Sequence, residues 1–274
     1  MYSISIDSRQ AYILECLMNQ AGTVTELAKA TKVSKITIRR DLIELEKLGY
    51  IKRVFGGAVS VNGRTTVIPL VLRKQRNQEA KKAIARYAVT MISDGECIAM
   101  DTGSTILEMA EYMQNLNTST VITTGFHCAG RLLSYPNIRV VLPGGILNSM
   151  EGALSGELAI QSLQSFYVDK FFLCVGAVDS SAGLTEHGLE DAQAKSIIIS
   201  RAKENILVID SSKFEKIAFK SVCGLNMIST VITDVCPPPK LLEAFKMAGI
   251  ITHIVSPQTG EVEIIKPVAE LSRD

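Results

Sequence analysis

The sequence contains no apolar run long enough to cross a membrane. A spanning helix needs roughly eighteen or more apolar residues in succession, and polar residues interrupt every hydrophobic stretch before that length. The opening segment MYSISIDSRQ also lacks the apolar core of a signal peptide. We therefore expect a soluble, cytoplasmic protein without a membrane partner, and its 274 residues, 47% of them hydrophobic, allow more than one domain.

Paired cysteines and clustered histidines are absent as well. The six cysteines form no C-x-x-C pair, and the three histidines are scattered along the chain. Zinc sites require ligands at short, regular spacing, and disulfides belong to oxidising compartments. We expect reduced thiols and no metal site.

The net charge of +1 hides a strong asymmetry along the chain. Residues 1–76 carry thirteen Lys and Arg against six Asp and Glu, whereas residues 77–274 carry sixteen against twenty-two. A basic first part on an acidic remainder favours a polyanionic partner at one end, such as nucleic acid. Charge alone does not identify that partner, because a charged face is often simply solvated.

The stretch 34–58 predicts a helix that enters a DNA groove. Ser34 is a suitable N-cap, and Gly49 stands where a left-handed residue would end the helix. An apolar stripe on this helix faces a core and consists of Ile38, Leu42, Leu45 and Leu48. The candidate DNA contacts lie at the cap and on the other face and are Ser34, Lys35, Thr37, Arg39 and Arg40.

Segments on either side complete a winged helix-turn-helix pattern. One amphipathic helix is predicted over 9–19, and Thr25 is expected to cap a second, short helix that a tight turn at 32–33 joins to Ser34. Residues 50–55 read as a strand that breaks at a Gly-Gly pair, so Lys52 and Arg53 are expected to contact the DNA backbone from a wing. The alternative is a small helical subdomain with a solvated charged face.

The remaining chain predicts a second, larger domain. Residues 60–76 are expected to be a linker between a DNA-binding domain at 1–59 and a domain at 77–274, because Gly63 and Pro69 interrupt a polar stretch. Beyond it, short apolar runs alternate with helical stretches, which indicates an α/β fold with a mostly parallel sheet covered on both faces. The apolar runs lie at 97–100, 120–123, 139–142, 171–175, 205–210, 230–233 and 253–255.

The loop DTGST at 101–105 is the strongest candidate ligand site, because open parallel sheets bind ligands at the carboxyl ends of their strands. A strand, a glycine turn and a helix N-terminus offer backbone N–H groups to a phosphate, and Thr102, Ser104 and Thr105 add hydroxyls around Gly103. Asp101 would repel phosphate, so we expect it to contact a ligand hydroxyl or to brace the loop. The loop lacks the endings of nucleotide and dinucleotide motifs, so no cofactor is expected. The alternative is that Ser104 or Thr105 only caps the helix.

Other strand ends supply weaker candidates. Thr123, Thr124, Gly144, Gly145, Asp179 and Lys213 each follow a predicted strand closely. Paired glycines permit the backbone to approach a ligand, and Lys213 would bring a cation to the pocket. The alternatives are that the glycine pair only forms a turn and that Lys213 is an ordinary surface lysine.

These motifs resemble the DeoR family of bacterial transcriptional regulators. TIRRDL and LEKLGYIKRVFGGAV, within 37–59, are similar to the family's DNA-binding segment. The DTGST loop, the Pro-Gly-Gly turn, Lys195 and the DSSKF segment at 210–214 are similar to its effector domain, whose fold resembles ribose-5-phosphate isomerase and glucosamine-6-phosphate deaminase. The resemblance implies a homo-oligomer, dimer or tetramer, that binds double-stranded operator DNA. It further implies a repressor of carbohydrate-metabolism genes that a phosphorylated sugar releases.

Carried over by residue, the resemblance implies that Ser104 and Thr105 hold phosphate, while Asp101, Asp179 and Lys213 contact sugar hydroxyls or brace the pocket. Two positions depart from the family pattern, since Thr124 stands where asparagine is common and Asp191 where glutamate is common. The main alternative is an enzyme, a sugar-phosphate isomerase or amino-sugar-phosphate deaminase, and a nucleoid or scaffolding protein without an effector is a third possibility. We expect a regulator without catalytic residues.

Overall fold

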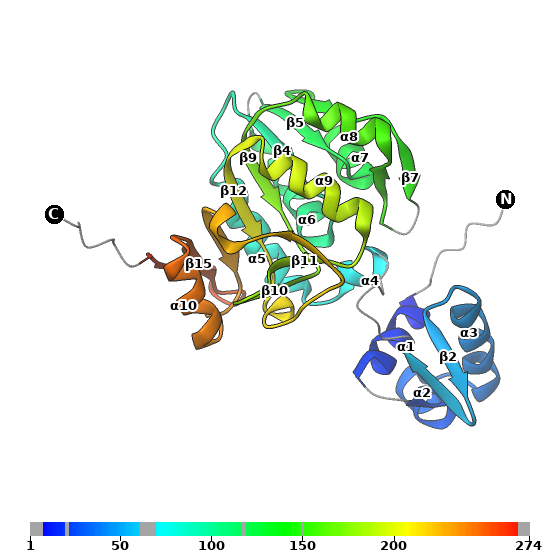
Figure 1. Cartoon of the computed structure of the whole chain (residues 1–274). Helices are drawn as coiled ribbons and strands as arrows, with labels where there is room; N and C mark the ends of the chain where they lie inside the picture. Colours follow the sequence, from blue (N-terminus) through cyan, green and yellow to red (C-terminus); the bar gives the residue numbers. More distant parts are fainter. Residues whose placement is uncertain (1–7, 20–21, 61–69, 117–118, 149–150, 268–274) are drawn as a thin grey trace. The chain divides into compact units, whose positions relative to one another are not determined.

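The computed structural model describes residues 8–19, 22–60, 70–116, 119–148 and 151–267 (Figure 1). The chain divides into two compact units, Met1–Thr66 and Val67–Asp274. Residues 61–69 of the expected linker lie outside the described residues. Residues 70–75 of the same linker form a helix, α4 (Leu70–Gln75), because Leu70 supplies an apolar side chain that is buried.

The N-terminal unit combines three helices with a small antiparallel sheet in the order β1-β3-β2. Its elements are α1 (Ser8–Asn19), β1 (Gly22–Thr23), α2 (Val24–Thr31), α3 (Lys35–Lys47), β2 (Ile51–Val54) and β3 (Gly57–Ser60). Ile13, Leu27, Ile38, Leu42 and Leu45 are among its buried side chains. The predicted stripe of α3 therefore faces this core, with Leu48 half-buried at its end.

Local capping sets the ends of α2 and α3. The cap of α2 is Thr23 and not Thr25 as predicted, because Glu26 stands three residues after Thr23 and completes a capping box with it. Lys32 adopts a left-handed conformation in the turn that follows. Ser34 caps α3 as predicted, accepting a hydrogen bond from the Thr37 backbone N–H at 3.1 Å.

A hairpin follows α3. Gly49 takes φ 78° after the helix, as its position predicts, and β2 pairs antiparallel with β3. Gly57 has to be glycine in this hairpin, since a Cβ there would lie 2.2 Å from the Gly22 carbonyl oxygen. The hairpin is the predicted wing.

The C-terminal unit is built on an eight-stranded sheet in the order β16-β15-β14-β12-β9-β4-β5-β6. All neighbouring pairs are parallel except β15 with β16. The predicted fold class, a winged helix-turn-helix domain joined to a mostly parallel α/β domain, is confirmed. The strands are β4 (Cys97–Met100), β5 (Ser119–Thr123), β6 (Ile138–Val141), β9 (Val168–Leu173), β12 (Ala202–Val208), β14 (Thr230–Thr233), β15 (Ile251–Val255) and β16 (Val262–Ile265).

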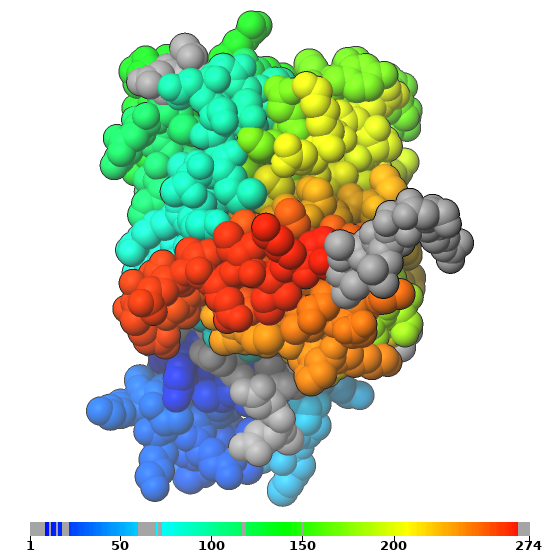
Figure 2. Space-filling view, turned by 90° about the vertical axis from the view of Figure 1, so that its left-hand side faces the viewer, coloured from blue at the N-terminus to red at the C-terminus, as the bar shows by residue number. Residues whose placement is uncertain are grey.

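Helices cover both faces of this sheet, because successive strand residues point to opposite sides. Ile98 and Met100 pack with α5 and α6 in one hydrophobic cluster, whereas Ala99 packs with α8 to α10 in a second cluster. The helices are α5 (Gln78–Val89), α6 (Ser104–Tyr112), α7 (Phe126–Leu132), α8 (Glu157–Gln164), α9 (Leu189–Ile199) and α10 (Pro239–Met247). Figure 2 shows the C-terminal strands, in red, against the cyan segment that contains α5.

Smaller elements connect the main layers. A ribbon of two antiparallel strands, β7 (Ile146–Asn148) and β8 (Ala153–Ser155), precedes α8, and β10 (Ala177–Asp179), β11 (Gly183–Glu186) and β13 (Lys220–Cys223) form a third sheet. Short 3-10 helices are η1 (Met113–Asn115), η2 (Ser211–Lys213) and η3 (Leu225–Met227). The six cysteines all fall within the described residues and are unpaired.

Candidate functional site

The face of α3 opposite the core presents cations and a cap to solvent. Lys35, Arg39 and Arg40 are exposed, and Thr37 is half-buried with its hydroxyl 2.9 Å from the Ser34 hydroxyl. Ile36, 64% exposed, stands among them. Guanidinium forks and a methyl-bearing side chain on one helix face suit the edges and methyl groups of bases in a major groove.

A partly buried ion pair holds α3 against α1. The Arg9 guanidinium donates to both carboxylate oxygens of Asp41, at 2.7 and 3.0 Å, and Gln10 donates to Glu44 at 2.5 Å. Asp41 is only 3% exposed although it directly follows the two exposed arginines. The sequence pattern assigned no role to Asp41, and the structure assigns it the positioning of the helix.

The hairpin β2–β3 carries the two predicted wing cations in different surroundings. Lys52 is exposed, and no ion pair is found for it among the described residues. The Arg53 guanidinium donates to Glu46 of α3 at 2.5 Å, and its backbone N–H donates to the same carboxylate at 2.8 Å. Arg53 therefore ties the wing to α3, and Lys52 is the more available cation.

A pocket opens in the C-terminal unit where β9 and β12 end and α6 begins. Ser104 and Thr105 of the first turn of α6 line it together with Cys174, Asp210 and Lys213. Gly103 caps α6 and has no side chain to offer, so the predicted alternative, in which Ser104 or Thr105 serves only as the cap, does not describe this helix. A helix N-terminus with two hydroxyls attracts an anion.

Cations from α4, from the turn after it and from α5 also line the pocket. They are Arg73, Arg76 and Lys81. Lys81 donates to the backbone carbonyls of Arg73 and Arg76, so it also holds the end of α4. Burial lowers the pKa of Lys81 to about 8, and burial followed by the nearby Arg73 lowers the pKa of Lys213. A bound anion would offset the repulsion among these neighbouring cations.

Two carboxylates, Asp210 and Glu151, partly neutralise this positive charge. Asp210 receives hydrogen bonds from the Asn77 side chain at 2.7 Å and from the Ser212 backbone at 3.1 Å. Glu151 receives one from Arg73 Nη2 at 2.5 Å. The Nε of Arg73 is buried and has no partner among the described residues.

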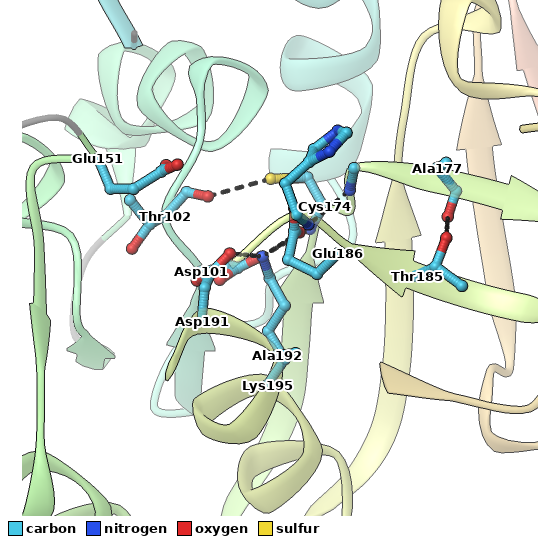
Figure 3. Close-up of polar contacts among 12 residues, drawn as sticks. Asp101, Thr102, Glu151, Cys174, Ala177, Thr185, Glu186, Asp191, Ala192 and Lys195 are labelled. Carbon is cyan, nitrogen blue, oxygen red and sulfur yellow. Dashed lines mark hydrogen bonds and ion pairs between the residues drawn. The ribbon is translucent and has the colours of Figure 1, made fainter. Parts of the chain in front are cut away.

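Beside the pocket lies a largely buried ionic cluster around Lys195 (Figure 3). Its ammonium is 2.7 Å from Glu186, 2.5 Å from Asp191 and 3.4 Å from Asp101. Asp101 also accepts from the backbone N–H of Cys174, a residue of the pocket wall. The cluster thus joins the ends of β4 and β9 to α9.

The carboxylates of this cluster differ in their protonation. Burial, opposed by Lys195, raises the pKa of Asp191 from 3.8 to about 8. Burial acts on Glu186 in the same direction, but Lys195 and the backbone N–H of His187 outweigh it and hold that pKa at about 2. Burial thus favours the protonated form of Asp191, whereas Lys195 and the His187 N–H favour the ionised form of Glu186.

The Cys174 side chain, directly after β9, leaves no room for a side chain at Gly103. A Cβ at this position would lie 2.2 Å from the Cys174 sulfur. That sulfur donates to the Thr102 carbonyl at 3.2 Å, and burial raises the pKa of the thiol well above its usual range. Cys174 therefore acts as an unreactive packing group that shapes the loop.

The three predicted threonines Thr102, Thr123 and Thr124 make contacts within the loops beside the pocket. Thr102 and Thr124 are buried with their hydroxyls 3.0 Å apart, and Thr123 accepts from the Gly125 backbone at 3.0 Å. These contacts brace the loops that follow β4 and β5. Within the residues that the structure describes, the lining of the pocket includes none of Thr102, Thr123, Thr124 and Asp101.

Gly144 and Gly145 lie between β6 and β7, and Asp179 is the last residue of β10. At Gly145 the close neighbour is the backbone of β8 and not a ligand. A Cβ at this position would lie 2.4 Å from the Ser155 carbonyl oxygen. Gly144 is exposed beside it. Asp179 closes the turn between β10 and β11 by accepting from the backbone of Ser181 and Ala182 at 2.8 and 2.9 Å.

Sequence reasoning missed several residues that the structure brings to this place. Arg73 and Arg76 fell within the expected linker, Lys81 looked like one of several lysines on a helix, and Glu186 followed no recognised motif. A basic run directly before a helix was the available signal. It could not show that the run folds back onto the strand ends.

The described part of the chain contains no helix that could span a membrane. It also contains no group of three or more His, Cys, Asp or Glu arranged to hold a metal ion. The three carboxylates that converge in the C-terminal unit surround an ammonium instead.

Family models match both units. The model of the DeoR-like helix-turn-helix domain matches residues 9–64, and that of the DeoR C-terminal sensor domain matches residues 76–235.

Whole-length relatives agree with these matches. The HTH-type transcriptional regulator GolR of Listeria innocua is 32% identical over 243 residues, which cover 88% of this chain and 96% of that protein. The glycerol-3-phosphate regulon repressor of Escherichia coli is 31% identical over 83% of this chain and 90% of its own length. Among solved structures, ribose 5-phosphate isomerase A of Methanocaldococcus jannaschii matches with a TM-score of 0.38 and 23% identity over 50% of this chain and 55% of its own.

Proposed function

The chain belongs to the DeoR family of transcriptional regulators, and from this premise we propose that it is a repressor of carbohydrate-metabolism genes that a phosphorylated sugar releases from operator DNA. The observation that carries the proposal is the pairing of an exposed cationic helix face in one unit with a cation-lined pocket in the other. A cytoplasmic location belongs to the same proposal, because the operator DNA of a bacterial regulator lies there.

The DNA-contact surface that we propose consists of Ser34, Lys35, Thr37, Arg39 and Arg40 on α3, with Lys52 on the wing. The arginines point away from the buried stripe and have the donor geometry for guanine or phosphate. Arg53 is bound to Glu46, so we assign it the positioning of the wing.

Arg40→Ala is expected to lower operator affinity by about 1–3 kcal/mol if Arg40 contacts a base edge. Lys52→Ala is expected to weaken binding to all duplexes alike and to reduce the salt slope by about one. Fluorescence anisotropy across a salt series, with duplexes selected from a random library, measures both effects. Lys240→Ala, an exposed lysine of the other unit, is the control. If Arg40→Ala and Lys52→Ala both bound DNA with wild-type affinity, another surface would contact the DNA.

The effector site that we propose is the pocket lined by Ser104, Thr105 and Lys213. The helix N-terminus and two hydroxyls suit a phosphate group, and the cations of α4 and α5 add the charge that a phosphate dianion requires. Asp210 offers a carboxylate to sugar hydroxyls. Asp101, Thr102, Gly103, Thr123 and Thr124 support this pocket from behind, and Gly144, Gly145 and Asp179 shape neighbouring turns. Calorimetric titration of the full chain with a panel of sugar phosphates, together with operator release by the same compounds, tests this assignment.

We favour a regulator over a sugar-phosphate isomerase or deaminase. An isomerase needs a carboxylate free to take a proton from a substrate carbon. Lys195, 2% exposed, is enclosed by Asp101, Glu186 and Asp191, so these groups satisfy one another. The pocket carboxylate Asp210 already accepts hydrogen bonds from Asn77 and Ser212. Turnover of ribose 5-phosphate or glucosamine 6-phosphate by the pure protein would reverse this preference.

We also propose a homo-oligomer, because two symmetric recognition helices are what a two-fold operator requires. The exposed apolar side chains of β7 and α8 are a suitable surface for a second copy of the chain. Ile146 is 72% and Leu158 66% exposed, and the two flank the same glycine turns. A two-stranded ribbon that exposes such groups is marginal by itself.

Ile146→Glu is therefore expected to weaken self-association by roughly tenfold or more, since it places a charge in an apolar contact. Light scattering over a concentration series measures the mass. Leu133→Glu, on a side chain 77% exposed at the end of α7, is the matched control. An unchanged mass for Ile146→Glu would exclude this surface.

A further inference from the structure

The ion pair between Arg73 and Glu151 connects two parts of the C-terminal unit that are 78 residues apart in the chain. Arg73 lies in the last turn of α4, and Glu151 lies in the turn between β7 and β8. Both side chains are largely buried, at 21% and 15% exposure, so water screens the pair only partly. The contact therefore restrains α4 relative to the β7–β8 ribbon.

Arg73 also faces the pocket, and only part of its donor capacity is used. Glu151 takes Nη2, while Nε is buried without a partner among the described residues. A buried N–H without an acceptor is costly, and a guanidinium binds best through two parallel hydrogen bonds. An anion in the pocket that reached Arg73 would supply the missing acceptor.

Phosphate and Glu151 would compete for this guanidinium. Two anions at one partly buried cation repel each other, and phosphate carries more charge than a carboxylate. Lys81 donates to the Arg73 backbone carbonyl and so holds the Arg73 main chain at the pocket, whereas Glu151 lies between β7 and β8 and is not part of the pocket lining. Phosphate would thus displace Glu151 and leave Arg73 in place.

We propose that the Arg73–Glu151 pair is a latch that the phosphate group of the effector opens. The inference rests on the effector pocket proposed above and adds how the pocket controls the protein. In the free protein Glu151 holds α4 through Arg73. When phosphate takes Arg73, α4 loses its tie to the β7–β8 ribbon. Since α4 is the first described element of its unit, the latch acts on the helix that comes next along the chain after the DNA-binding unit.

Glu151→Gln tests the latch, because it removes the competing charge and keeps the shape of the side chain. We expect the full-length variant to bind inorganic phosphate roughly tenfold more tightly than wild type, and to bind selected operator duplexes more weakly in its absence. Phosphate binding is measured by calorimetry, and operator binding by anisotropy. Glu157→Gln, the same change at an exposed glutamate of α8 that pairs with Gln161, is the matched control.

The exchanged pair, Arg73→Glu with Glu151→Arg, gives an independent measurement. It restores an ion pair but places a carboxylate at the pocket, so operator binding without phosphate should return towards wild type while phosphate binding is lost. Wild-type phosphate and operator affinities in Glu151→Gln would overturn the latch, even with the pocket intact. If the wild-type chain itself binds neither inorganic phosphate nor any sugar phosphate, the failure lies in the proposed effector pocket instead.

Discussion

Replacement of Lys195 by methionine is expected to destabilise the C-terminal unit by about 3–5 kcal/mol, the usual cost of removing one partner from a buried ionic group. The ammonium is 2% exposed and serves three carboxylates, two of them within 2.7 Å. Without it, ionised Glu186 keeps only its backbone donors, Gly176 and His187. Calorimetry of the full chain should show the transition of this unit lowered by about 10 °C or more, with the other transition unmoved.

Asp191→Asn is the control for this prediction, and its effect depends on pH. Folding raises the pKa of Asp191 from 3.8 to about 8, so the folded state binds more protons than the unfolded state between these values. The stability that this proton contributes is fully present below pH 3.8 and is lost as the pH rises to about 8. An amide cannot ionise, so the stability of Asp191→Asn should not show this dependence on pH. At neutral pH the variant should lose only about 1 kcal/mol of its free energy of unfolding. Equal losses for Lys195→Met and Asp191→Asn at neutral pH would contradict the assigned protonation.

Ser104→Asp is expected to yield a repressor that binds operator DNA but does not respond to its effector. Ser104 is 7% exposed in the first turn of α6, and a carboxylate there would stand against the ligand phosphate. At 4 Å and an effective dielectric constant near 20, each pair of like charges costs about 4 kcal/mol, or roughly a thousandfold in affinity. Aspartate is favourable at a helix start, so loss of folding does not account for the effect.

Ser104→Asn separates charge from size, because asparagine fills the same space without ionising. We expect it to retain operator release at a several-fold higher effector concentration, whereas Ser104→Asp should give none at any concentration tested. Reporter expression in cells and operator release in vitro measure the same quantity in two ways. Normal induction of Ser104→Asp would remove α6 from the effector site.

The sequence alone predicted the recognition helix and its surroundings well, because the responsible interactions are local. Ser34 caps a backbone N–H three residues away, and Gly49 can take a positive φ that other residues avoid. The same holds for the central strands, whose apolar runs mark positions that only a sheet covered on both faces can bury. The cap of α2 was misplaced by two residues, since Thr23 and Thr25 are both plausible caps and Glu26 selects between them.

The lining of the pocket that we propose as the effector site was predicted only in part, and the missing part has one physical cause. Ser104 and Thr105 follow a strand directly, so their place at a carboxyl edge could be inferred from order along the chain. The cationic wall could not be inferred, because Arg73 precedes the first strand of the sheet and reaches the pocket only when α4 packs beside α6.

By itself, the sequence determined the elements, the two-domain organisation and the family, since caps, periodicity and motifs act over a few residues. Tertiary structure decided which charges meet: Arg73 with Glu151, and Lys195 with Asp101, Glu186 and Asp191. These partners are brought together by chain packing across up to 94 residues, and their burial sets their protonation. A sequence pattern does not show which distant charges will meet or how deeply they will be buried, because Coulomb interactions and desolvation depend on position in space.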